Sequence, residues 1–164
     1  MKIGIISDTH DNIKDTEKAF SELKEKGVSQ IIHCGDFCAP FMIKIFDNFD
    51  IPVHIVFGNI DDRFRTTRNA DSSKNVKLHG DTAQLPIGGK LIAVAHFPNI
   101  AGAFAHSGNF DLVCYGHTHK KFIQKVSDKT TLLNPGEIMG RFGVKTYAVY
   151  DTDNNEVEFF ELQK

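Results

Sequence analysis

The segment Met1–Asp8 (MKIGIISD) sets a pattern that the rest of the chain repeats. Its apolar run, Met1–Ser7, ends in the polar triplet Asp8-Thr9-His10. Four later apolar runs end in the same way, on short segments that contain Asp, Asn or His. The five closing segments are Asp8-Thr9-His10, Gly35-Asp36, Gly58-Asn59-Ile60-Asp61, Ala95-His96 and Gly116-His117-Thr118-His119. Apolar runs of this length that end at turn residues predict buried strands.

These closing segments are expected to lie close together in space. In α/β proteins, ligands bind beyond the carboxyl ends of the strands, where the loops converge. Taken singly, each residue has an ordinary structural interpretation: Asp8 as a helix cap, Asp36 as a turn residue, and a histidine as a hydrogen-bonded side chain. Taken together, carboxylates and imidazoles at several strand ends are the ligand types that hold catalytic divalent metals. The combined pattern therefore favours a metal site.

The first half of the chain alternates strands and helices. After the strand at 2–7, residues 12–26 show the pattern of an amphipathic helix that ends at Gly27. Strands at 30–34 and 52–57 flank a second helix at 40–49, with Pro40 near its start. This β-α-β-α-β order predicts a parallel sheet with right-handed crossovers. The polar segment 62–73 is expected to begin as a short helix and continue as a loop over the site.

The second half of the chain predicts short strands with mixed pairing. Gly88-Gly89 is a hairpin signal between two of them, and Asp151–Asn155 is turn chemistry between the last two. The predicted strands are 76–78, 82–87, 90–95, 111–115, 121–126, 130–133, 145–151 and 156–162. Two mixed sheets packed as a sandwich and flanked by helices would accommodate both halves. We expect one α/β domain that spans residues 1–164.

The composition is that of an ordinary globular protein. The chain has 164 residues, of which 41% are hydrophobic and 24% charged, and its formal net charge is −2. Neither a nucleic-acid footprint nor a polybasic membrane surface is expected from that balance. The three cysteines are too few, and odd in number, for a disulfide framework. With no signal-peptide pattern before the first strand, the expectation is a cytoplasmic protein.

The order Asp-x-His, Gly-Asp, Gly-Asn-x-Asp, His, Gly-His-x-His resembles that of the calcineurin-like metallophosphoesterases. The match spans Asp8 to His119, and Asn134-Pro135-Gly136-Glu137 extends it toward the small bacterial and archaeal phosphodiesterases of that superfamily. The resemblance implies an α/β/β/α sandwich fold. It also implies hydrolysis of phosphate esters by direct attack of a hydroxide that bridges two divalent metals, without a phospho-enzyme.

The resemblance also implies a role for each candidate ligand. Asp8, His10 and His119 would hold one metal; Asn59, His96 and His117 would hold the other. Asp36 would bridge both metals, and Asp36, Asn59 and His96 would be the residues closest to the chemistry. A mixed nitrogen and oxygen ligand set suits Mn²⁺, which we place first, and also Ni²⁺, Co²⁺, Zn²⁺ or Fe. A pure Mg²⁺ site is disfavoured because Mg²⁺ prefers oxygen ligands.

The chain departs from the family pattern at Ile60. Many relatives carry a histidine there, thought to protonate the leaving group, and an isoleucine side chain cannot do so. Asp61 is a weak candidate for the missing proton donor. Arg63, Arg65 and Arg68 are capable of clamping a phosphate, but a solvated segment is the favoured interpretation.

Two other functions remain open from the sequence. One is a phosphomonoesterase or nucleotide pyrophosphatase that uses the same site. The other is a non-catalytic scaffold similar to the metallophosphoesterase-like subunit of retromer, which lacks part of the ligand set that this chain retains. The expected partner is a small phosphate ester, with no specific nucleic-acid or membrane binding. The resemblance also allows a homo-oligomer.

Overall fold

The computed structural model describes residues 1–162, which form four α-helices and eleven β-strands. The helices are α1 (Ile13–Glu25), α2 (Met42–Asp47), α3 (Arg63–Asp71) and α4 (Pro98–His106). The strands of the first half are β1 (Lys2–Ile6), β2 (Gln30–His33), β3 (Val53–Ile55), β4 (Val76–Leu78), β5 (Thr82–Ile87) and β6 (Lys90–Ala95). Those of the second half are β7 (Leu112–Cys114), β8 (Lys121–Lys125), β9 (Thr131–Pro135), β10 (Thr146–Asp151) and β11 (Glu156–Glu161).

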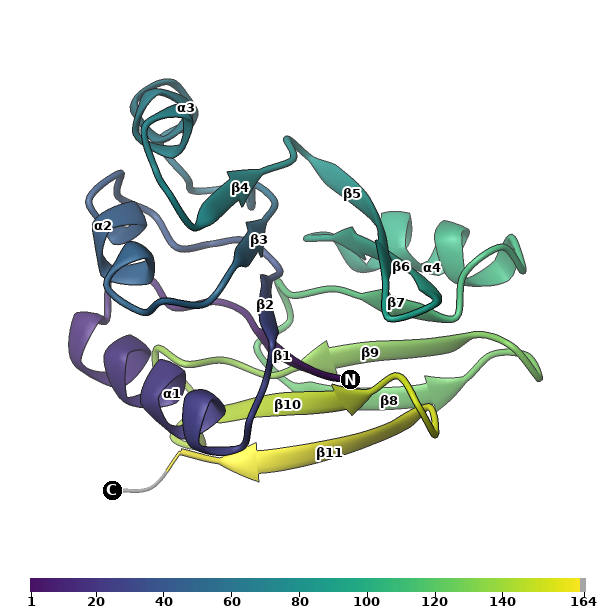
Figure 1. Ribbon diagram of the computed structural model, residues 1–164. Helices are drawn as coiled ribbons and strands as arrows, with labels where there is room; N and C mark the ends of the chain where they lie inside the picture. Colours follow the sequence, from purple (N-terminus) through teal and green to yellow (C-terminus); the bar gives the residue numbers. More distant parts are fainter. Residues whose placement is uncertain (163–164) are drawn as a thin grey trace.

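The strands form two mixed sheets. One has the order β11-β10-β1-β2-β3-β4, with β1 to β4 parallel and β10 and β11 antiparallel. The other has the order β5-β6-β7-β9-β8, in which β6, β7 and β9 are parallel. Helices lie on opposite sides of the pair of sheets, with α1 and α2 on one side and α4 on the other (Figure 1). The predicted α/β fold of two mixed sheets flanked by helices is confirmed.

Three apolar clusters hold these layers together. Phe20 and Leu23 of α1 pack with Ile31 of β2 between the first sheet and its helices. Ile5 and Leu112 belong to a second cluster, which lies between the sheets. The third cluster joins α4 to the second sheet, and its members include Ala101, Ala105 and Val113. The alternation of side chains along β1 explains how one strand serves two clusters, because successive side chains point to opposite faces.

Two helices differ from the sequence-based expectation. Helix α3 occupies most of the segment where a short helix and then a loop were predicted, and the side chain of Asp62 caps it by accepting the Arg65 N–H. Helix α4 was not predicted at all; it begins at Pro98, and its buried Ala101 and Ala105 face the second sheet. No helix among the described residues is both long and apolar enough to cross a membrane.

A chain of neutral side chains links three strands of the first sheet. His79 Nε2 and His54 Nδ1 are 2.9 Å apart, and His54 Nε2 lies 3.0 Å from Gln30 Oε1. Because the Gln30 oxygen can only accept a hydrogen bond, His54 carries its hydrogen on Nε2 and accepts a hydrogen bond from His79 on Nδ1. Burial, and then the neighbouring His79 and Lys77, lower the pKa of His54 to about 4.

We expect the stability of the fold to fall as the pH drops from about 6.5 to 4. In that window the unfolded chain binds a proton at His54 that the folded chain does not, so protonation favours unfolding. His54→Gln should remove about 1 kcal/mol of this pH dependence, a figure reduced for the partial exposure of the ring. Urea unfolding at pH 7 and pH 4.5 measures the effect, with exposed His106→Gln as the control. Equal pH dependence in wild type and His54→Gln would contradict the expectation.

Candidate metal centre

The predicted site residues come together at the carboxyl ends of five strands. Asp8 and His10 follow β1, Asp36 follows β2, and the loop after β3 carries Asn59. The second sheet supplies the rest: His96 follows β6, and His117 and His119 follow β7. The site therefore lies where the two sheets meet, and it depends on both.

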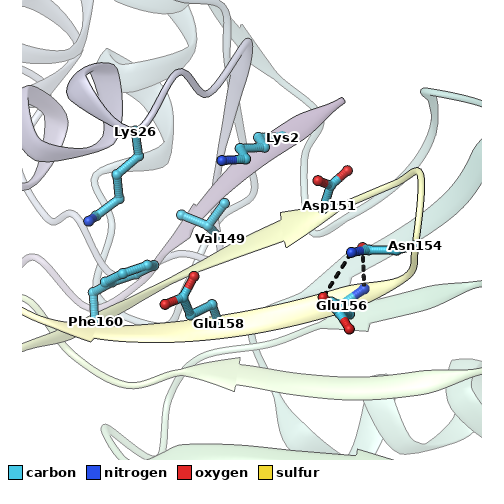
Figure 2. A pocket seen from close by; sticks show the side chains of 8 residues that line it. All are labelled: Lys2, Lys26, Val149, Asp151, Asn154, Glu156, Glu158 and Phe160. Carbon is cyan, nitrogen blue, oxygen red and sulfur yellow. Dashed lines mark hydrogen bonds between the residues drawn. The ribbon is translucent and has the colours of Figure 1, made fainter.

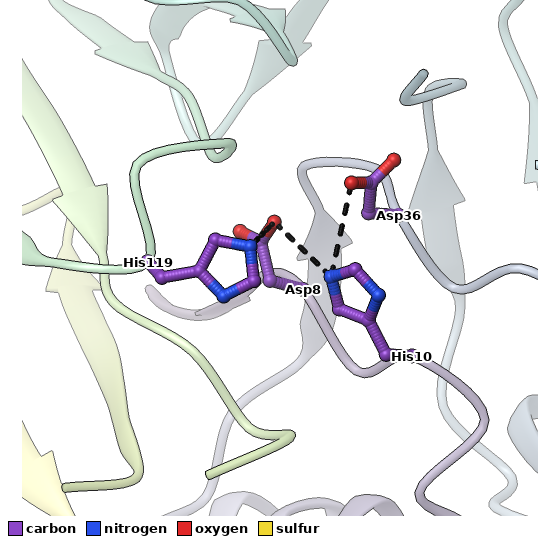
Figure 3. Close-up of side chains that lie close together, drawn as sticks. All are labelled: Asp8, His10, Asp36 and His119. Atoms are coloured by element: carbon purple, nitrogen blue, oxygen red, sulfur yellow. Dashed lines mark ion pairs between the residues drawn. The ribbon is translucent and has the colours of Figure 1, made fainter. Parts of the chain in front are cut away.

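A first group consists of Asp8, His10, Asp36 and His119, whose candidate ligand atoms all lie within 4.8 Å of one another (Figure 3). Asp8 Oδ1 is 3.8 Å from His10 Nε2 and 3.4 Å from His119 Nε2. Asp36 Oδ2 lies 3.7 Å from His10 Nε2. These three contacts are not hydrogen bonds, and the side chains converge on a common centre.

A second group consists of Asn59, His96 and His117. Asn59 Oδ1 lies 3.0 Å from His96 Nε2 and 2.9 Å from His117 Nδ1, and the two ring nitrogens are 3.3 Å apart. Asp36 Oδ2 joins this group to the first, because it lies 3.4 Å from His96 Nε2. One carboxylate thus stands between two sets of candidate ligands.

The donor atoms of the first group fit a cation. Asp8 Oδ1 and His10 Nε2 are buried and have no hydrogen-bond partner among the described residues. A buried polar atom without a partner is costly, and a bound ion would satisfy both atoms at once. Carboxylate oxygen and imidazole nitrogen are suitable ligands for several divalent transition metals.

Backbone and tautomer both orient the ligands toward this centre. Asp8, His10, Asp36, His117 and His119 all have positive φ angles, between 42° and 68°. Non-glycine residues rarely adopt this region, and such residues cluster at functional sites. His96 Nδ1 lies 2.9 Å from the Cys34 carbonyl, so Nδ1 carries the hydrogen and Nε2 is free to bind.

Asp36 and His96 influence each other's protonation. Burial disfavours the Asp36 carboxylate, but the hydrogen bond and charge of His96 outweigh it and lower the pKa of Asp36 below its ordinary value. Burial likewise opposes a charge on His96, whereas its hydrogen bond with Asp36 raises the pKa of His96. The lowered pKa of Asp36 favours an ionised carboxylate at the position shared by the two groups.

Two acidic residues around the site have roles that the sequence did not reveal. Asp61 accepts three backbone N–H groups: those of Asp36 at 3.1 Å, Cys38 at 2.6 Å and Gly58 at 2.6 Å. With both oxygens engaged, Asp61 joins the loops after β2 and β3, which leaves little freedom for donating a proton. Glu137 is fully buried and contacts His119. The sequence marked Glu137 only as the last residue of the segment Asn134-Pro135-Gly136-Glu137, without a role.

Several other polar side chains of the first half of the chain lie outside the candidate ligand set. Arg63 pairs with Asp81, while Arg65 and Arg68 line a separate hollow beside Pro40, in line with the solvated interpretation. Asn12 caps α1 by accepting the Asp15 N–H. His33 accepts the Gly35 N–H and donates to Thr9, and burial lowers its pKa to about 3.

The candidate ligands open into a cleft of about 600 Å³. Ile60 forms one part of its lining, and Met139, Arg141 and Phe142 form another.

A second hollow, of about 450 Å³, lies beside the start of β1, at the end of that strand away from Asp8 (Figure 2). It mixes Lys2 and Lys26 with several acidic side chains, and Lys26 Nζ stands 3.7 Å from the centre of the Phe160 ring. That hollow offers no convergent set of ligand atoms.

Comparisons with known proteins agree with this geometry. A family model described as the calcineurin-like phosphoesterase superfamily domain matches residues 1–155. Phosphodiesterase MJ0936 of Methanocaldococcus jannaschii is 33% identical over 167 residues, which cover 99% of this chain and 100% of the relative. A solved archaeal phosphodiesterase superposes with a TM-score of 0.90 at 32% identity, covering 99% of this chain and 100% of that one.

A more distant solved structure shares the fold. The phosphoesterase Yfce of E. coli superposes with a TM-score of 0.70 at 16% identity, with 99% of this chain and 100% of that chain covered. At this level of identity the likeness concerns the arrangement of the sheets and helices alone.

We expect Asp61→Asn to destabilise the fold by about 2 kcal/mol. In the variant, the side-chain NH₂ group would face a backbone N–H that a carboxylate oxygen accepts in the wild type, and that N–H would lose its acceptor. Urea unfolding of the metal-free protein measures the loss. Asp62→Asn is the matched control, since asparagine caps a helix as well as aspartate does. An unchanged unfolding free energy in Asp61→Asn would show that its three backbone contacts contribute little.

Proposed function

The chain belongs to the calcineurin-like phosphoesterase superfamily, and on that premise we propose that it is a phosphodiesterase whose site holds two divalent metal ions. The observation that carries the proposal is the pair of ligand groups that share Asp36. Membership of the family makes the chain a metal-dependent phosphoesterase. The number of ions, their identity and the class of ester are the parts that we propose.

Each ion takes its ligands from one group. Asp8, His10 and His119 would hold one ion, and Asn59, His96 and His117 would hold the other; Asp36 would serve as a ligand of both groups. Bound divalent ions would supply an activated water as the nucleophile and neutralise charge on the phosphate. Asn59 adds a ligand oxygen without a negative charge, which limits repulsion of an anionic substrate.

The donor set is compatible with several divalent metals. The mixture of imidazole nitrogens with carboxylate and amide oxygens is suited to Mn²⁺, with Ni²⁺, Co²⁺, Zn²⁺ and Fe as alternatives.

We further propose that residues 1–164 act as one domain in the cytoplasm, where its three free cysteines would stay reduced.

The lining of the cleft favours diesters over monoesters. A phosphodiester carries one negative charge and two organic groups, whereas a monoester carries up to two charges and one organic group. Among the described residues of the lining, Arg141 is the one Lys or Arg, and Ile60, Met139 and Phe142 are apolar side chains beside the candidate ligands. Ile60 is 48% exposed and Phe142 is 58% exposed, so both are available to contact organic groups of a substrate.

We expect metal-stripped protein to be inactive on bis-p-nitrophenyl phosphate and to regain activity with about two equivalents of Mn²⁺. Asp36→Ala should lose activity by at least about a thousandfold, because both groups lose their common ligand. Release of p-nitrophenol during a Mn²⁺ titration measures both effects, and Asp128→Ala, which lies in an exposed turn, is the control. Faster hydrolysis of p-nitrophenyl phosphate than of the diester would instead support a monoesterase.

A second prediction concerns the leaving group. Because the Ile60 side chain at the lip of the cleft cannot donate a proton, poor leaving groups should react slowly. Ile60→His should raise turnover of phenyl diesters by at least about tenfold and leave p-nitrophenyl diesters nearly unchanged. Ile60→Gln, which adds a polar side chain without an acid, is the comparison. Equal gains with both leaving groups would rule out proton donation as the cause.

A further inference from the structure

We propose that Glu137 is a positioning residue that connects the candidate ligand His119 to the loop 140–145 at the mouth of the cleft. The proposal rests on the proposed function in one respect, namely that His119 binds a metal ion. It concerns this chain's own side chains, and the hydrogen bonds involved exist without the metal.

The two oxygens of Glu137 have different partners. Oε2 lies 2.6 Å from His119 Nδ1, and Oε1 accepts the backbone N–H of Phe142 at 2.6 Å. The Glu137 side chain is fully buried, so it depends on such partners to offset the loss of water. One carboxylate thereby holds a candidate ligand with one oxygen and a loop with the other.

The contact with His119 determines which ring nitrogen can bind an ion. A carboxylate accepts a hydrogen, so His119 carries its hydrogen on Nδ1 and leaves the Nε2 lone pair free. Nε2 is the atom that lies 3.4 Å from Asp8 Oδ1 in the first ligand group. A carboxylate behind a histidine ligand fixes its tautomer and orientation, and its loss usually weakens metal binding.

Glu137 is itself held in place by the backbone around it. Ile138 N–H donates to Ser7 O at 3.2 Å, and Met139 N–H donates to Asp8 O at 3.0 Å. Thr146 N–H donates to Glu137 O at 2.9 Å. The segment that carries Glu137 therefore runs alongside the end of β1, where the ligand Asp8 lies.

The loop 140–145, which follows this segment, contains glycines with positive φ angles and exposed side chains. Gly140 and Gly143 have φ angles of +83° and +92°, which residues other than glycine rarely adopt. These two glycines flank the exposed Arg141 and Phe142. The Phe142 ring stands edge-on to His119 with 5.7 Å between centroids. The Phe142 N–H bond to Glu137 fixes the loop beside that ring. Order in the loop and orientation of His119 thus depend on the same carboxylate.

Two consequences follow from this shared dependence. Replacing Glu137 should weaken metal binding and disturb at least one of its two contacts, with His119 or with the Phe142 amide. Conversely, because coupling between sites is reciprocal, metal binding at His119 should slow hydrogen exchange of the Phe142 amide.

Glu137→Gln tests the proposal with little change in side-chain volume. Glutamine offers one acceptor and one NH₂ group, so it can satisfy His119 or Phe142 but not both. Mn²⁺ alone is the probe of affinity, and two readouts in metal-free protein report the local structure. These are the tautomer of His119, from ¹⁵N imidazole spectra assigned with His119→Gln, and the exchange rate of the Phe142 amide. Glu158→Gln removes the same charge from an exposed position on β11 and serves as the control.

We expect Glu137→Gln to raise the Kd for Mn²⁺ by about 10- to 100-fold. The same variant should either lose the Nδ1–H tautomer of His119 or exchange the Phe142 amide at least tenfold faster. An unchanged Kd overturns the proposal, and so does a raised Kd with both local readouts unchanged. If wild-type protein binds no Mn²⁺, the proposed function fails, while the two local readouts still decide whether Glu137 holds His119 and Phe142.

Discussion

The candidate site depends on an unusual reversal of the backbone directly after its strands. Asp8, Asp36 and His117 each take a positive φ angle at or near the point where β1, β2 and β7 have ended. Each such residue costs on the order of 1–3 kcal/mol, so other contacts must maintain the conformation. The loops supply these contacts to one another: Asp8 N–H donates to Gly35 O, and His10 N–H donates to Asp36 O. With the backbone in this conformation, Asp8 and Asp36 place their carboxylates in the first ligand group.

The packing between the sheets determines whether the two ligand groups meet. His96 and His117 follow strands of one sheet, whereas Asp36 and Asn59 follow strands of the other. The apolar cluster between the sheets, which includes Ile5 and Leu112, therefore sets the distance across the site. Close approach also requires small residues at the contact. A Cβ on Gly116 would overlap Ser7 Oγ, and one on Gly58 would overlap Asp36 Oδ1.

Much of this could be predicted from the sequence because hydrophobic period and strand-end polarity are local signals. The helix at 12–26, the hairpin at Gly88-Gly89 and the candidate ligands all belong to this class. Helix α4 lacks a hydrophobic period of this kind, because most of its nine residues are apolar or small. Pro98 at its start is a local signal of a helix, but it was not used. Side chains that act on distant backbone were missed for a related reason. Asp61 binds the Cys38 amide 23 residues away, and no spacing rule relates the two.

The two ligand groups differ in how charge surrounds them, and this asymmetry reaches the rim of the cleft. The first group contains Asp8 and shares Asp36, and Glu137 lies behind His119. The second contains the neutral Asn59, and a backbone carbonyl, that of Cys34, lies behind His96. Coulomb attraction for a divalent cation is therefore stronger at the first group. The loop with Arg141 and Phe142 is attached to that more negative side through Glu137, whereas Ile60 adjoins the neutral side through Asn59. A substrate in the cleft would thus contact a cationic and aromatic lip beside the more strongly held ion, and an aliphatic lip beside the other.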